Sequence, residues 1–124
     1  MPKLYDLEER TYQFAKNVAN CTKKLKKSLS NLEYAKQVIR SSGSVGANYI
    51  EANESLGDKN FLMRIRISRK EAKESAYWLR LLLETNETLN NGNEIQELFN
   101  ESIELKKILS TILEKSKRKV ERIS

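Results

Sequence analysis

The chain has 124 residues, a length that fits a single domain spanning residues 1–124. Charged residues make up 32% of it, hydrophobic residues 39%, and there is one proline, a balance that favours long solvated helices over sheets. Histidine is absent, which removes the commonest general base and the commonest transition-metal ligand. The net charge of +6 points to an anionic partner, with nucleic acid first, although cations that only solvate helix faces would give the same total.

The beginning of the chain and its cysteine content indicate a cytoplasmic protein. Residues Met1 to Asp6 lead directly into charged residues and contain no apolar core of a signal peptide. No apolar run approaches the roughly 20 residues that span a bilayer. Cys21 is the only cysteine, so no disulfide within the chain is expected.

The first helix is expected to run from Asp6 to near Ser28. Asp6 and Glu9 have the spacing of a capping box, in which two side chains satisfy the free N–H groups at a helix start. One face of this helix then repeats apolar or small residues at spacings of four and three, which is an a/d stripe. Its members are Leu7, Thr11, Phe14, Val18, Cys21 and Leu25.

The second helix is expected to begin at another capping box, Ser30 to Glu33, and to end near Leu56, where Gly57 offers a left-handed C-cap. Two glycines lie inside this helix, and each costs about 1 kcal/mol relative to alanine. A helix that keeps them needs another backbone close by. We therefore expect a tight packing seam against the third helix, formed by Gly43, Gly46, Ala47, Asn48 and Glu51.

The last two helices complete the pattern. The third is expected from about Lys59 to Glu87, with Asp58 as its cap, and the fourth begins at Asn93 after a loop over residues 90–93. Both carry apolar stripes with the helical period. Four amphipathic helices joined by short loops predict an all-α fold, an antiparallel up-and-down four-helix bundle.

No motif for catalysis is present. The glycines of the second helix lack the Lys-Ser/Thr pair that a phosphate-binding loop needs. Glu51, Glu71 and Glu74 could be imagined as a metal site, but di-iron bundles use Glu-x-x-His motifs, and none occurs here. We favour a polar network between the second and third helices that includes Arg40. We expect no catalytic residues, no cofactor and no bound metal.

A basic face runs along the third helix. Its cations recur at spacings of three and four, with Tyr77 among them, on the side opposite the apolar stripe. Cations with an interleaved aromatic residue suit phosphate contacts and base stacking. The alternative is a solvated face neutralised by pairs such as Lys70–Glu74. The candidate nucleic-acid contacts are Arg64, Arg66, Arg69, Lys70, Lys73 and Arg80.

A further apolar side of the third helix predicts an oligomer interface. Met63, Trp78 and Leu81 lie off the apolar stripe. A helix that is apolar on more than one side needs more than one neighbour. Either another subunit or the fourth helix can cover these residues, so both alternatives stay open.

Two motifs occur in order between Arg40 and Leu83. They read SVGANYxEA from Ser44 and IxISxKEAxExxYWLxLL from Ile65. This pair resembles the four-helix-bundle family of 23S rRNA-intervening-sequence proteins, the S23 group. Ser68 stands where that family's alanine is expected.

The resemblance implies a binding or assembly role. Family members are bacterial proteins, encoded within insertions in large-subunit rRNA genes or as free-standing genes, that form ring-like homopentamers with basic surfaces. A related branch serves as the accessory protein of diversity-generating retroelements and is thought to bind nucleic acid and a reverse transcriptase. The resemblance thus implies a homo-oligomer that contacts RNA or DNA. The alternative is a protein-binding adaptor, for example an accessory subunit of a reverse transcriptase.

Overall fold

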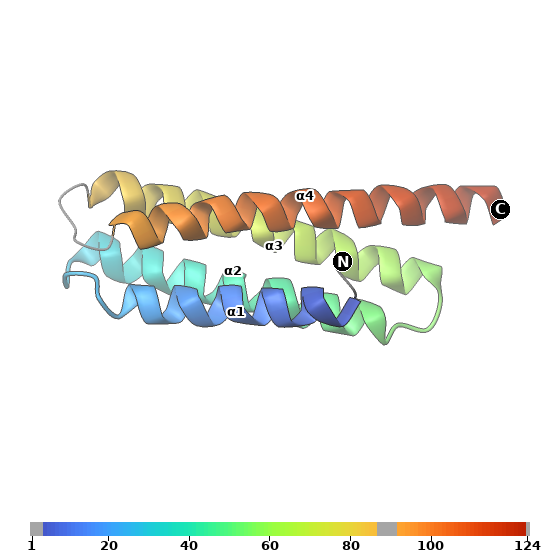
Figure 1. Ribbon diagram of the computed structural model, residues 1–124, viewed down its shortest axis with the longest axis horizontal. Coiled ribbons are helices and arrows are strands. Elements are labelled where there is room, and N and C mark those ends of the chain that lie inside the picture. Colours follow the sequence, from blue (N-terminus) through green and yellow to red (C-terminus); the bar gives the residue numbers. More distant parts are fainter. Residues whose placement is uncertain (1–3, 87–91, 124) are drawn as a thin grey trace.

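The structure, a computed structural model, describes residues 4–86 and 92–123. It contains four helices: α1 (Leu4–Thr22), α2 (Leu29–Asn53), α3 (Asp58–Thr85) and α4 (Gly92–Ile123). All four helices lie along the long axis of the molecule, and each runs antiparallel to the one before it in the chain (Figure 1). The predicted all-α, up-and-down four-helix bundle is confirmed.

The ends of α1 and α2 differ from the prediction by a few residues. α1 begins at Leu4, so Asp6 lies inside its first turn, and it ends at Thr22 and not near Ser28 as predicted. The cap of α2 is Ser28, whose Oγ accepts a hydrogen bond from the backbone N–H of Asn31 at 3.1 Å. Ser30 is therefore already helical, because the chain enters the helix one serine earlier than expected.

The later boundaries are also shifted. α2 ends at Asn53. Gly57 has the positive φ expected of it, +99°, but it immediately precedes α3 and so does not close α2. Asp58 lies in the first turn of α3 and is not its cap. Residues 90 and 91 of the predicted loop, and the predicted end of the third helix at Glu87, lie outside the described residues, whereas Gly92 and Asn93 already belong to α4, so the prediction of a loop was wrong there.

The core lies along the axis of the bundle and uses the predicted stripes. Around this axis the helices follow chain order, so that each packs on the next and α1 closes on α4. The α2–α3 and α3–α4 interfaces are the most extensive, and the α1–α4 interface is the least. The largest fully buried side chains are Tyr49, Phe14, Ile65, Leu79, Leu82, Ile95, Leu105 and Leu109.

Serine hydroxyls line the α2–α3 interface. Ser41 Oγ and Ser75 Oγ lie 2.8 Å apart and share a hydrogen bond. Ser68, the departure from the family pattern, donates to the Val45 carbonyl at 2.7 Å. Small side chains thus let α2 and α3 approach closely while every one of these buried hydroxyls keeps a partner.

The close approach predicted at the glycines occurs at Gly46 alone, and the neighbour is α1. Gly46 is buried, and a Cβ placed on it would lie 2.9 Å from Thr11 Oγ1. Gly43, Ala47 and Glu51 are exposed, and nothing lies within 4 Å of a Cβ placed on Gly43. Assigning these three residues to the seam was wrong, because a spacing of four residues keeps them together on the outer side of α2 while Gly46 faces inward.

Candidate nucleic-acid interface

The outer side of α3 presents the predicted cations to solvent. Arg66, Lys70 and Lys73 are exposed, and none of them forms an ion pair with a carboxylate among the described residues. Arg80 is exposed as well, but its Nε lies 3.0 Å from Glu84 Oε2 one turn later. We call these four residues, Arg66, Lys70, Lys73 and Arg80, the basic face of α3.

Two of the six candidate cations lie apart from this face. Arg64 is half-buried and donates from Nη1 to Asn48 Oδ1 at 3.0 Å, so it points toward α2. The two-residue step from Arg64 to Arg66 turns the helix by about 200°, which places them on opposite sides. Arg69 is also half-buried. The predicted six-residue site is therefore a four-residue face.

The alternative in which glutamates neutralise this face occurs only in part. The predicted Lys70–Glu74 pair does not form; instead Arg40 Nη2 of α2 lies 3.9 Å from Glu74 Oε2. Arg40 Nη1 also lies 3.8 Å from Glu71 Oε1. The predicted polar network between α2 and α3 thus exists, and Arg40 draws Glu74 away from the lysines of the basic face.

Glu71 is the most perturbed carboxyl group of this network. Its side chain is only 10% exposed, and Oε1 has no hydrogen-bond partner. Burial raises the pKa of Glu71, and a hydrogen bond with Glu74 together with the negative charge of Glu74 raises it further. The nearby cations Arg40 and Lys70 oppose this shift of the pKa. Glu71 therefore holds its proton more tightly than an ordinary glutamate.

The imagined metal cluster of Glu51, Glu71 and Glu74 does not assemble. Asn48 meets Arg64 across the α2–α3 interface, so Glu51, one turn beyond Asn48, lies toward the beginning of α3 and away from Glu71. In the described part of the chain, no three His, Cys, Asp or Glu residues are grouped so that they could hold a metal ion.

An aromatic cluster joins the basic face to the α2–α3 interface. The Tyr77 ring stands edge-on to Trp78, with centroids 5.0 Å apart and planes at 83°. Trp78 in turn lies 5.9 Å from Tyr34 of α2. Trp78 is half-buried and packs against the core. Tyr34 of α2 is therefore one neighbour of Trp78, whose side chain stays partly exposed.

The three predicted interface residues do not form one patch, because Met63 lies far along α3 from Trp78 and Leu81, which are one helical turn apart. Met63 is 45% exposed, whereas Leu81 is half-buried. They are separated by 18 residues of α3, or about 27 Å along its axis. Nothing in the structure brings a partner to these residues, and the oligomer interface stays a prediction.

The sequence analysis missed an exposed apolar row on α2. Leu32, Ile39 and Ile50 are 55%, 46% and 40% exposed. Their spacings of seven and eleven residues place them on one side of the helix, and this spacing is the signal that could have revealed them. We call these three residues the α2 row.

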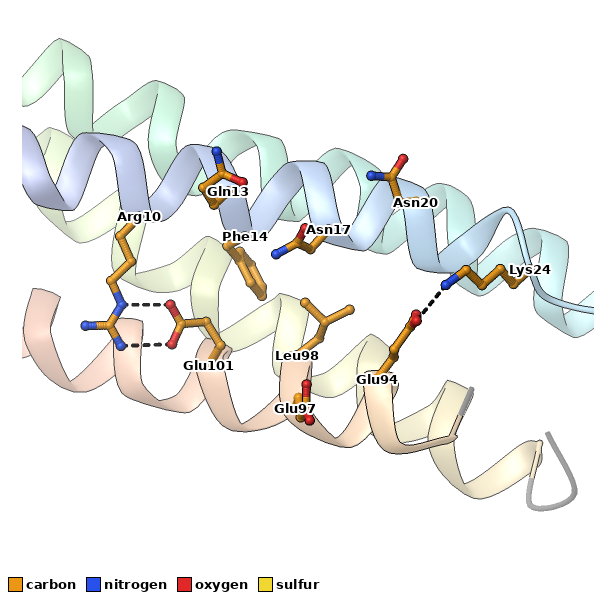
Figure 2. A pocket seen from close by; sticks show the side chains of 10 residues that line it. All are labelled: Arg10, Gln13, Phe14, Asn17, Asn20, Lys24, Glu94, Glu97, Leu98 and Glu101. Atoms are coloured by element: carbon orange, nitrogen blue, oxygen red, sulfur yellow. Dashed lines mark hydrogen bonds and ion pairs between the residues drawn. The ribbon is translucent and has the colours of Figure 1, made fainter. Parts of the chain in front are cut away.

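A polar groove separates α1 from α4. Its volume is about 540 Å³, and ion pairs cross it toward each end (Figure 2). Arg10 binds Glu101 through two hydrogen bonds of 2.7 and 2.8 Å, and Lys24 Nζ lies 2.6 Å from Glu94 Oε1. These bonds raise the pKa of Arg10 and lower the pKa of Glu94. In Figure 2 the side chains of Phe14 and Leu98 lie between the two ion pairs, so core residues form the floor of the groove.

The helices do not have the character of membrane spans. Over the described residues, none combines the length and the apolar composition required to cross a bilayer.

Comparison with known proteins identifies the family. Residues 5–111 match the family model of the 23S rRNA-intervening sequence protein. The chain is also similar to a solved structure, a protein of unknown function from the S23 ribosomal protein family of Bacteroides thetaiotaomicron VPI-5482. The two share 31% identity with a TM-score of 0.73, over 86% of this chain and 96% of that chain. None of the curated proteins gives a significant match. Because the family model spans most of the sequence, the chain belongs to the 23S rRNA-intervening sequence protein family.

Proposed function

We propose that this protein is a non-enzymatic bundle that binds nucleic acid through the basic face of α3. The observation that carries the proposal is the exposure of Arg66, Lys70 and Lys73 without an ion pair to any described carboxylate. Cations of this kind supply the phosphate contacts that dominate nucleic-acid affinity. RNA is the first ligand to test, because the family description names an intervening sequence of 23S rRNA.

A titration at two salt concentrations tests the proposal. A labelled structured RNA is titrated with the protein at about 50 mM and about 200 mM salt, since phosphate contacts release counterions and weaken steeply as salt rises. Replacing Arg66, Lys70 and Lys73 together with Gln should weaken binding at least roughly tenfold and flatten the dependence on salt.

The matched control removes the same charge elsewhere. Lys36, Lys107 and Lys117 are each paired with a glutamate three residues earlier on other helices. Their joint replacement with Gln gives the same net charge as the triple variant of the basic face. No binding at the lower salt concentration, or an equal loss in both triple variants, would refute a specific role of this face.

Protein binding is the second candidate function, and the α2 row favours it. Aligned, exposed apolar side chains commonly mark an interface. We propose that a second copy of the chain covers this row, so that the protein is an oligomer. Light scattering should then give a mass above that of one subunit, and Ile39→Lys with Ile50→Lys should reduce it.

Met63→Lys provides the comparison, because Met63 is exposed to a similar extent on α3. If Met63→Lys dissociates the oligomer and the α2 double variant does not, the interface lies on α3 as the sequence predicted. A wild-type mass of one subunit at every concentration would rule out self-association.

A further inference from the structure

Tyr77 is placed within the basic face of α3. Its side chain is 60% exposed. Lys73 lies one helical turn before it and Arg80 one turn after, at axial separations of about 6 and 4.5 Å. Lys70 lies two turns before it. An exposed aromatic ring is thus flanked along the helix by cations on both sides.

The ring is also held in place. Tyr77 and Trp78 form a T-shaped ring pair at a centroid separation of 5.0 Å, and Trp78 itself packs against the core and beside Tyr34. A surface ring that is already oriented loses little conformational entropy when a ligand stacks on it. Tyr77 therefore has the properties of a pre-formed stacking surface.

These properties select one class of nucleic acid. Phosphate contacts alone do not distinguish single strands from duplexes. In a duplex the faces of the bases are covered by their neighbours, whereas the unpaired bases of a single strand can stack on an aromatic side chain. We propose that α3 binds a single-stranded segment of RNA or DNA, with one base stacked on Tyr77 and adjacent phosphates on Lys73 and Arg80. This inference rests on the function proposed above.

The chain offers a matched control for an exposed tyrosine. Tyr12 of α1 is also 60% exposed, but its preceding turn carries Glu8 and Glu9. Negative charges there repel a phosphate backbone, and the following turn carries one cation, Lys16, so Tyr12 has the exposure of Tyr77 without cations on both sides.

Binding is measured by fluorescence anisotropy with a labelled strand of about 15 nucleotides, a length that covers one site, and with the same strand annealed to its full complement as a duplex. Tyr77→Ala should weaken binding of the single strand between about five- and a hundredfold, the range found for loss of one stacked base. Tyr77→Phe should bind like the wild type because it keeps the ring. Tyr12→Ala should bind like the wild type as well.

Trp78 supplies a second readout. It is the only tryptophan of the chain and contacts the Tyr77 ring. The bound single strand should change the fluorescence of Trp78, and the duplex should leave this fluorescence unchanged.

The outcomes separate the two proposals. If Tyr77→Ala binds the single strand as tightly as the wild type, or weakens binding of the duplex equally, stacking on Tyr77 is wrong. The basic face still functions in that case, provided that the triple variant of Arg66, Lys70 and Lys73 loses affinity. If neither ligand binds the wild type at low salt, the proposed function itself fails.

Discussion

Replacement of Gly46 with alanine tests the contact between α1 and α2. The new Cβ would lie 2.9 Å from Thr11 Oγ1 and 3.2 Å from Thr11 Cβ, both closer than such atoms normally approach. The hydroxyl cannot simply turn away, because it donates to the carbonyls of Leu7 and Glu8 at 2.9 and 3.0 Å. The two helices must therefore separate slightly, or Thr11 must give up its hydrogen bonds.

Two opposing terms set the size of the effect. Alanine stabilises a helix by about 1 kcal/mol relative to glycine. Overpacking a closed interface costs about 1–3 kcal/mol. Gly46→Ala should therefore lower the free energy of unfolding by up to about 2 kcal/mol.

Gly43→Ala is the control, because it makes the same change in the same helix where nothing lies within 4 Å. It should raise the free energy of unfolding by about 1 kcal/mol. Because the propensity term is common to both variants, their difference of about 1–3 kcal/mol measures the clash with Thr11 alone.

Guanidinium unfolding followed by circular dichroism gives the free energy of unfolding of both variants. The comparison requires that the m-value, the slope of this free energy against denaturant concentration, is the same in both. The measurements are repeated at a tenfold lower protein concentration, so that any association of subunits is separated from folding. Equal stability of the two variants would refute the close approach of α1 to Gly46.

Three further substitutions probe the α2–α3 interface. Burial raises the pKa of Glu71 in the folded state above its ordinary value in the unfolded state. Between these two pKa values the folded state binds more protons than the unfolded state, so the free energy of unfolding falls as the pH rises through this interval. Glu71→Gln removes this loss; thermal unfolding should show a gain in stability near pH 7 that disappears near pH 4, and a constant difference would contradict the argument. Asn86→Ala should cost about 1–3 kcal/mol in urea unfolding, because buried Asn31 exchanges hydrogen bonds of 2.9 and 2.7 Å with it, whereas Asn100→Ala on the exposed side of α4 should be nearly neutral. Ser68→Ala should cost about 1 kcal/mol through loss of its bond to the Val45 carbonyl, and an unchanged denaturation midpoint would show that this bond contributes nothing.

The helices and their inner faces could be predicted because helical periodicity is a local property. Val38, Ser42, Val45, Tyr49 and Ala52 recur at spacings of three and four and are all buried. The same arithmetic would have separated Arg64 from Arg66, since two residues along a helix lead to nearly opposite sides. That error came from treating neighbours in sequence as neighbours on the surface.

The remaining differences depend on which helix lies beside which face. Periodicity shows that Gly46 faces inward, but it does not say whether α1 or α3 meets it there. Trp78 contacts Tyr34, a side chain 44 positions away that reaches it only after α2 and α3 have paired. The choice of Ser28 over Ser30 as the cap is a matter of backbone geometry that two serines in nearly the same context do not reveal.

The order of the helices around the axis has a consequence for how the chain folds. Every interface except one joins helices that are consecutive in sequence, so most native contacts form across a short loop. Topologies of this kind fold within microseconds to milliseconds because little loop entropy is lost before contacts form. The exception is the closure of α1 on α4, which joins the two ends of the chain across the sparsest interface. Local opening should therefore begin at the α1–α4 interface, while the other three interfaces stay assembled.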